Sequence, residues 1–118
     1  MIKVLVVDDA DFLRKRVVSY LKEENYQVSE AASGTVGLTQ YVAHQPDVIL
    51  LDLVLPDIDG ISIVKNIRQK DKYVKIIMIS GEADRSVIKD AVIAGITDFV
   101  VKPFQMDTLK EKIENVLK

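Results

Sequence analysis

The chain has 118 residues, of which 48 % are hydrophobic and 29 % are charged, so residues 1–118 suit one domain with one hydrophobic core. Its 16 basic and 18 acidic side chains give a formal charge of -2, which offers no reason to expect binding to nucleic acid or to a membrane. The absence of cysteine and the single histidine, His44, exclude thiolate and histidine-based zinc sites, so any bound metal must use oxygen ligands.

Short runs rich in Val and Ile, each followed by turn or helix-start residues, predict buried parallel strands. These runs span residues 3–7, 48–51, 76–79 and 99–101, and a weaker strand is expected at 27–31. The first run ends at Asp8, too early for a signal peptide or a membrane span, so we expect a cytoplasmic protein. Polar residues follow the four strong runs: Asp8 and Asp9, Asp52, Ser80, and Lys102.

The segments between these runs have helical periodicity, so strands and helices alternate along the chain. A second helix is expected from about Thr35 to His44, and Gly95 is expected at the C-terminal cap of the fourth helix. Asp107 is placed to cap the start of the last helix. In the first helix, four basic residues are expected largely on the solvent-exposed face: Arg14, Lys15, Arg16 and Lys22.

Alternating strands and helices with right-handed crossovers predict a three-layer α/β sandwich with a five-stranded parallel sheet and five helices. The sequence does not show the strand order, and we assume the flavodoxin-like order 2-1-3-4-5. Under this order the carboxyl ends of the first and third strands lie side by side, at the switch point where open sheets bind ligands. Asp8, Asp9 and Asp52 would surround one crevice there. Ser80 and Lys102 would lie on the strands beyond it.

Three carboxylates around one crevice repel one another, so a cation that neutralises them should bind well. Oxygen ligands without a full protein cage suit Mg²⁺, which usually keeps water and a substrate phosphate among its ligands. Asp52 would then be the nucleophile that forms an acyl phosphate, while Lys102, Mg²⁺ and the Ser80 hydroxyl stabilise the transferred group. Taken singly, each residue also fits a structural role, such as Asp8 or Asp9 as a helix cap. Five such residues at one sheet edge favour a site.

Five motifs, in order and at matching spacing, resemble those of response-regulator receiver domains of two-component signalling. They are VVDD at residues 6–9, LLDLVLPDIDG at 50–60, ISG at 79–81, AGITDF at 94–99 and VKPF at 101–104. The resemblance covers essentially the whole chain and implies the flavodoxin-like receiver fold. In this family the peptide bond between Lys102 and Pro103 is usually cis.

The resemblance also implies a metal site and a phosphoacceptor. Asp8 and Asp9 become metal-binding acids, and Mg²⁺ becomes the expected cofactor. Asp52 becomes the phosphoacceptor and a further metal ligand. The backbone carbonyl of Val54 completes the ligands that the protein supplies.

Three further residues take signalling roles under this resemblance. Ser80 and Lys102 become the pair that senses the phosphoryl group, and Phe99 becomes the aromatic residue that changes rotamer on activation. The output surface is then the fourth helix, the fifth strand and the fifth helix, through which the charge change is relayed to a downstream protein.

The expected protein is a stand-alone, chemotaxis-type receiver that accepts a phosphoryl group on Asp52 from a histidine kinase or a histidine phosphotransfer protein. It is expected to be a monomeric regulator rather than an enzyme, with intrinsic self-phosphorylation and self-dephosphorylation. Chemotaxis, a phosphorelay and an origin within a longer protein all stay open.

The alternative from the enzyme class is a small haloacid-dehalogenase-like phosphatase, because Asp9 and Asp11 also follow an apolar strand. Asp9 would be the nucleophile and Asp52 would be idle, while the acidic pair expected after Lys102 is missing. A flavodoxin-like cofactor binder fits less well, because the first turn is acidic and lacks the Thr, Ser and Gly of a phosphate loop.

The residues at two positions provide a prediction for the lifetime of the phosphorylated state. In receivers, the side chains two residues after the phosphoacceptor and two after the serine flank the path of the attacking water, and here they are Val54 and Glu82. Valine cannot form a hydrogen bond with water, and the charge of Glu82 opposes approach to a phosphoryl group. We therefore expect slower self-dephosphorylation than an amide at position 54 would give.

Overall fold

Five strands form one parallel sheet in the computed structural model, which describes residues 1–81 and 85–118. The strands are β1 (Lys3–Val7), β2 (Gln27–Ala31), β3 (Val48–Asp52), β4 (Lys75–Ser80) and β5 (Asp98–Val101). The helices are α1 (Asp11–Glu23), α2 (Gly34–His44), α3 (Gly60–Arg68), α4 (Arg85–Ala94) and α5 (Met106–Val116). The strand order is β2-β1-β3-β4-β5, so the predicted topology is confirmed.

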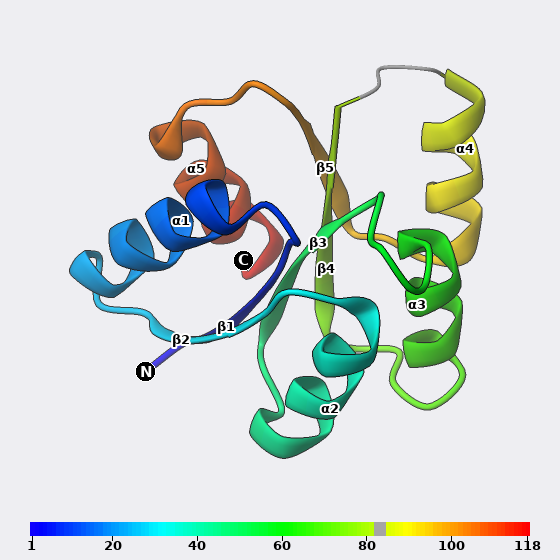
Figure 1. The fold of residues 1–118 in the computed structure, drawn as a ribbon, viewed down its shortest axis with the longest axis horizontal. Coiled ribbons are helices and arrows are strands. Elements are labelled where there is room, and N and C mark those ends of the chain that lie inside the picture. The colour runs from blue at the N-terminus through cyan, green and yellow to red at the C-terminus, as the bar shows by residue number, and fades with distance from the viewer. Residues whose placement is uncertain (82–84) are drawn as a thin grey trace.

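Helices cover both faces of the sheet (Figure 1). Helices α1 and α5 lie on one face, and α2, α3 and α4 lie on the other. Successive strand side chains alternate between the two cores, as strand geometry requires. Leu5, Ile49 and Ile76 pack on the side of α2, α3 and α4, whereas Val48 and Ile77 pack on the side of α1 and α5. Burial on both faces explains the nearly continuous apolar runs in the sequence.

The predicted ends of the helices are partly right. Gly95 ends α4 with a φ of 117°, and its N–H bonds the carbonyl of Ala91, so the predicted C-terminal cap is confirmed. The cap predicted for α5 is wrong, because the helix starts at Met106 and Gln105 is the capping position. Asp107 lies inside the first turn instead, where its charge still favours the positive end of the helix dipole.

Helix α1 begins without a side-chain cap. Ala10 occupies the capping position and has no side chain that can accept a hydrogen bond. The carboxylate of Asp8 accepts a hydrogen bond from the Ala10 N–H at 2.9 Å, before the helix starts. The structure therefore does not support a role for Asp8 or Asp9 as the helix cap of α1. Within the described residues, no helix is both long and apolar enough to cross a membrane.

Candidate functional site

Three carboxylates meet at the carboxyl ends of β1 and β3. The two strands are neighbours, with Val7 paired to Leu51, so Asp8 and Asp52 follow adjacent positions at the same edge of the sheet. Asp8 and Asp52 are buried, whereas Asp9 is exposed. One carboxylate oxygen from each of the three lies within 4.8 Å of the others. The three acids that the sequence predicts to lie together therefore do so.

Lys102 reaches this group from the end of β5. Its Nζ lies 3.0 Å from Oδ2 of Asp52 and 3.6 Å from Oδ2 of Asp8. The backbone holds it there, because the Lys102 N–H donates to the carbonyl of Ser80 at 2.7 Å. The peptide bond between Lys102 and Pro103 is cis, as the resemblance implied. The lysine thus links the two buried acids. We call Asp8, Asp9, Asp52 and Lys102 the acid cluster.

The electrostatics of the acid cluster favour an added cation. Burial raises the pKa of Asp8, and the charge of Asp52 raises it further, against the lowering effects of the Ala10 N–H and of Lys102. Burial alone would lower the pKa of Lys102, but its hydrogen bond and charge interactions with Asp52 and Asp8 outweigh burial and raise the pKa. One ammonium group faces three carboxylates, so the cluster keeps a negative charge.

This set of ligands fits Mg²⁺. Carboxylate oxygens are hard ligands, and a magnesium site commonly uses one or two of them and leaves the remaining positions to water and a phosphate. Asp9 is exposed, so the cluster is open to solvent on the side where those ligands would enter. Asp8, Asp9 and Asp52 could hold the ion.

The loop from β3 to α3 donates a backbone hydrogen bond to the carboxylate of Asp52. The Val54 N–H donates to Oδ1 of Asp52 at 3.1 Å, while the Val54 side chain is 70 % exposed. The loop is closed by a hydrogen bond from the Gly60 N–H to the Leu53 carbonyl at 2.8 Å. A Cβ atom at position 60 would lie 2.8 Å from the carbonyl oxygen of Asp52, so only glycine allows this approach.

The remaining predicted residues lie on β4 and β5. Ser80 ends β4 and is buried, and Phe99 on β5 is half-buried, paired with Met78. A small cavity of about 10 Å³ lies between these strands and α4. Its lining comprises Leu53, Met78, Ser80, Val87, Ile88, Ala91, Ile96 and Phe99. Glu82, predicted to tune the lifetime, lies outside the described residues.

Comparison with known proteins decides the family. The sequence model of the response regulator receiver domain matches residues 4–114. The chain belongs to the response-regulator receiver family. It is 39 % identical over 116 residues to the chemotaxis protein CheY of Bacillus subtilis, across 98 % of this chain and 97 % of that protein. The receiver is therefore of the CheY type, consistent with phosphoacceptor signalling in a two-component system, and the phosphatase alternative is not favoured.

Solved receiver structures have the same fold. The chemotaxis protein CheY4 of Vibrio cholerae is 32 % identical, with a TM-score of 0.94 and 98 % of each chain covered. A CheY of Borrelia burgdorferi, solved in a complex with CheX, BeF3 and Mg²⁺, is 31 % identical, with a TM-score of 0.93 across 99 % of this chain and 90 % of that one. Receivers of this family are signalling regulators rather than enzymes of the usual kind.

One residue of this receiver lies elsewhere than its sequence pattern predicts. Arg14 was expected on the exposed face of α1, but it is 8 % exposed and donates from its NH1 group to the Asp8 carbonyl at 2.8 Å. Helical periodicity assigns charged side chains to solvent, and it contains no information about a buried acceptor on another element. The ion pair of Arg14 with Asp11, three residues earlier, was the one local signal in the sequence.

A second residue was missed because its partner is distant in sequence. The carboxylate of Asp57, in the β3–α3 loop, accepts hydrogen bonds from the N–H groups of Gly34 and Thr35 and from the Thr35 hydroxyl, at 2.8, 2.9 and 2.6 Å. These bonds lower the pKa of Asp57, with the hydroxyl contributing most. Asp57 thus supports the start of α2 from another loop and connects the β3–α3 loop to that helix.

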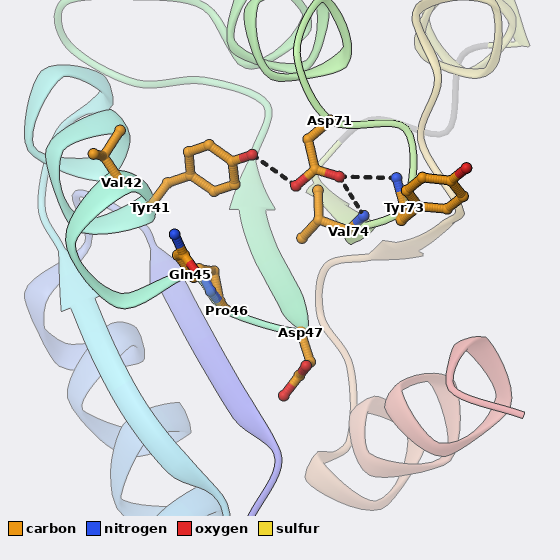
Figure 2. Close-up of a pocket in the computed structure, with 8 residues that line it drawn as sticks. All are labelled: Tyr41, Val42, Gln45, Pro46, Asp47, Asp71, Tyr73 and Val74. Carbon is orange, nitrogen blue, oxygen red and sulfur yellow. Dashed lines mark hydrogen bonds between the residues drawn. The ribbon is translucent and has the colours of Figure 1, made fainter.

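A cavity of this receiver lies elsewhere. It measures about 530 Å³ and lies at the amino ends of β3 and β4, away from the acid cluster (Figure 2). Tyr41 points across it, and its hydroxyl donates to Oδ2 of Asp71 at 2.7 Å. Oδ1 of Asp71 accepts hydrogen bonds from the N–H groups of Tyr73 and Val74 at 2.9 and 3.0 Å. Asp71 is therefore fully engaged by the protein itself.

Proposed function

We propose that Asp52 is the phosphoacceptor of this receiver. The observation that carries the proposal is the position of its buried carboxylate, 3.0 Å from Lys102 and within 4.8 Å of Asp8 and Asp9. One carboxylate oxygen of Asp52 bonds to phosphorus as the bond between phosphorus and the donor histidine nitrogen breaks, and that nitrogen keeps the electron pair. The proposed donor is a histidine kinase or a histidine phosphotransfer protein.

Asp8, Asp9, Asp52 and the Val54 carbonyl are the proposed ligands of Mg²⁺. When bound, Mg²⁺ supplies the positive charge that lets a phosphoryl group approach the carboxylates. The Val54 N–H keeps its place on Asp52 Oδ1 and so holds the carboxylate in one orientation. Lys102 provides a second positive charge for the phosphoryl oxygens, and its present contact with Asp52 supports that role.

Ser80 and Phe99 are the proposed switch residues. Ser80 ends β4, the strand paired with β3, and its hydroxyl is the proposed donor to a phosphoryl oxygen. The cavity beside Phe99 is about 10 Å³, which is much smaller than an aromatic ring. A rotamer of Phe99 directed toward Ser80 therefore requires side chains of α4 to shift, and this links the phosphorylation site to the helix surface.

The surface of α4, β5 and α5 is the proposed contact for the downstream protein. Val92 and Ile93 on α4 are 57 % and 73 % exposed, which provides apolar contact area for a partner. We include in the proposal that residues 1–118 form one monomeric, cytoplasmic receiver domain without nucleic-acid or membrane binding. Self-phosphorylation and self-dephosphorylation, with Val54 and Glu82 tuning the second, belong to the same proposal.

Borohydride trapping after treatment with acetyl phosphate tests the phosphoacceptor. Mass spectrometry should locate the label on Asp52 in the wild type when Mg²⁺ is present, and Asp52→Asn should lose it. Asp47→Asn, an exposed aspartate at the other end of β3, is the matched control and should be labelled like the wild type. Label on Asp9 with none on Asp52 would instead support the phosphatase alternative.

Lys102→Ala tests the sensing role separately. The variant should still accept phosphate, at a reduced rate, because Asp52 and the metal ligands remain. It should fail to switch, because the cation that holds the phosphoryl group against β5 is lost. NMR shifts around Phe99 on phosphorylation measure the switch, and shifts identical to those of the wild type would rule out this role.

A further inference from the structure

Arg14 is a buried cation next to the acid cluster. It lies in the first turns of α1, and only 8 % of the residue is exposed. Helical side chains lean toward the start of the helix, so its guanidinium is directed toward the end of β1. A charged side chain is rarely buried unless its donors are paired.

This one guanidinium forms hydrogen bonds or ion pairs with three segments of the chain. Its contacts are Nε to Glu30 Oε1 at 2.9 Å, NH1 to the Asp8 carbonyl at 2.8 Å, and NH2 to Asp11 Oδ1 at 2.8 Å. Glu30 belongs to β2, Asp11 starts α1, and Asp8 follows β1. The planar fork of arginine suits such an arrangement, because its donors have fixed directions that lysine lacks.

The contact with Asp8 fixes the peptide unit between two proposed metal ligands. A peptide bond is planar, so holding the Asp8 carbonyl also sets the plane from which Asp9 begins. The N–H of Asp8 is held as well, because it donates to the Ala31 carbonyl at 3.0 Å. Arg14 and Ala31 thus hold the backbone of Asp8 from both sides. These two contacts hold the backbone of Asp8 and do not involve its carboxylate.

The charge of Arg14 is balanced away from the cluster. Glu30 and Asp11 both accept from the guanidinium, and the hydrogen bond to Glu30 makes the largest contribution to a raised pKa of Arg14. The arginine is therefore a permanent cation with its own counterions. Loss of a nearby positive charge alone would strengthen Mg²⁺ binding to the acids, whereas loss of their positioning would weaken it.

We propose that Arg14 is a positioning residue for the metal site, which holds the Asp8 carbonyl and thereby sets the geometry of the Asp8 and Asp9 pair for Mg²⁺. The inference rests on the proposed magnesium site. Mg²⁺ accepts little deviation from octahedral geometry, so a shift of this pair is costly to binding. Partners that orient metal ligands from outside commonly contribute 10- to 100-fold to metal affinity.

The test is the magnesium dissociation constant of the unphosphorylated protein, measured by calorimetric titration. Arg14→Met removes the fork but keeps an unbranched apolar stem, and it should raise the dissociation constant by about 10- to 100-fold. Lys15→Met removes an exposed positive charge from the adjacent position of α1 and should leave the constant within about 2-fold of the wild type. Arg14→Lys keeps the charge without the fork and should fall between the wild type and Arg14→Met.

The unfolding free energy, measured in EDTA, separates positioning from a general loss of stability. If Arg14→Met does not fold, Arg14→Lys and Glu30→Ala, which removes one anchor of the fork, provide the same comparison. Variants that are folded, less stable and unchanged in magnesium affinity would show a purely structural role and overturn the inference. Tighter binding in Arg14→Met would overturn it too, because it would mean that only the charge matters. A wild type that binds no Mg²⁺ would instead refute the proposed metal site itself.

Discussion

The two ends of the sheet use aspartates in opposite ways. At the carboxyl ends, burial and the neighbouring Asp52 raise the pKa of Asp8. At the amino ends, burial also raises the pKa of Asp71, but hydrogen bonds from Tyr41 and from two backbone N–H groups outweigh burial and lower it. Asp71 is thus satisfied by the protein, whereas Asp8 and Asp52 leave a charge that an added cation can neutralise. A large cavity is therefore a weaker sign of function here than an unsatisfied charge.

The largest expected difference between the two ends is in metal affinity. Asp9→Asn replaces an anionic ligand by a neutral amide and should raise the dissociation constant for Mg²⁺ by about 10- to 100-fold. Asp47→Asn changes an exposed aspartate that lines the amino-end cavity and should leave the constant unchanged. Calorimetric titration of both variants measures this. Equal affinities would mean that the three carboxylates do not form the site.

Stability should show the opposite pattern. Asp71→Ala leaves the Tyr41 hydroxyl and two backbone N–H groups without their acceptor, and should lower the unfolding free energy by about 1 to 3 kcal/mol. Tyr41→Phe removes one of these bonds and should cost about 0.5 to 1.5 kcal/mol. Tyr20→Phe, which removes an exposed bond of 3.2 Å to Asp107, is the matched control and should cost less. Urea unfolding in EDTA measures all three.

If Asp71→Ala and Tyr41→Phe were as stable as the wild type, the hydrogen bonds to Asp71 would not stabilise the amino end of the sheet. Loss of phosphorylation in Tyr41→Phe at full stability would contradict it more directly, because it would connect the amino end to the chemistry at Asp52.

The lifetime of the phosphorylated state should depend on one exposed valine and not on another. Val54→Asn places an amide where it can orient the attacking water, and should shorten the lifetime by about 3- to 30-fold, which corresponds to about 0.7 to 2 kcal/mol of barrier. Val42→Asn makes the same change at the amino-end cavity, at a side chain that is 64 % exposed, and should have no effect. The decay rate at saturating Mg²⁺ is the measurement. A rate for Val54→Asn equal to or slower than that of the wild type would overturn the prediction.

The smallest expected effects concern pH. The folded pKa of Asp71 lies below its ordinary value of 3.8, so Asp71 stabilises the fold above about pH 4, and this contribution is lost as the pH falls through the folded pKa. The folded pKa of Asp8 lies above 3.8, so the folded state binds a proton more readily, and acidification toward pH 4 relieves a cost. The contributions of the two aspartates to the unfolding free energy should therefore change with pH in opposite directions.

Two substitutions measure these slopes in EDTA. Asp8→Asn should be more stable than the wild type at neutral pH, because it removes a buried charge beside Asp52, and the advantage should shrink toward pH 4. Asp71→Asn should be less stable than the wild type at neutral pH, and the difference should shrink as the pH falls through the lowered pKa of Asp71. Slopes of the same sign would show that the two aspartates experience similar environments.

Most of the fold follows from local patterns in the sequence. The strand predicted at 27–31 has the bounds of β2, and the other strands end within one residue of the prediction, because burial on both faces produces uninterrupted apolar runs. Asp8, Asp52 and Lys102 were predicted to meet because parallel strands place their carboxyl ends at one edge. Asp9 was predicted to join them because it is the next residue after Asp8.

The errors concern contacts between distant segments. Arg14 is buried because Glu30, on another strand, accepts from it, and Asp57 supports α2 from a different loop. Neither partner is within a helical turn of the residue, so periodicity cannot predict the pair. The cap predicted at Asp107 was two residues too late, since Gln105 is the capping position and the helix begins at Met106. Local rules predicted elements, and tertiary contacts decided how their ends are fixed.

The contact between Gly60 and the backbone of Leu53 has a consequence for how receivers diversify. Residues 53–60 form a closed ring whose two ends are joined by one hydrogen bond, with Asp52 immediately before it. Between these ends the ring is exposed at Val54, where a new side chain can be added without displacing Asp52. Under the roles proposed for Asp52 and Val54, substitutions at the exposed positions of the ring can change the rate of signal decay, while the glycine at its end keeps the backbone close to Asp52.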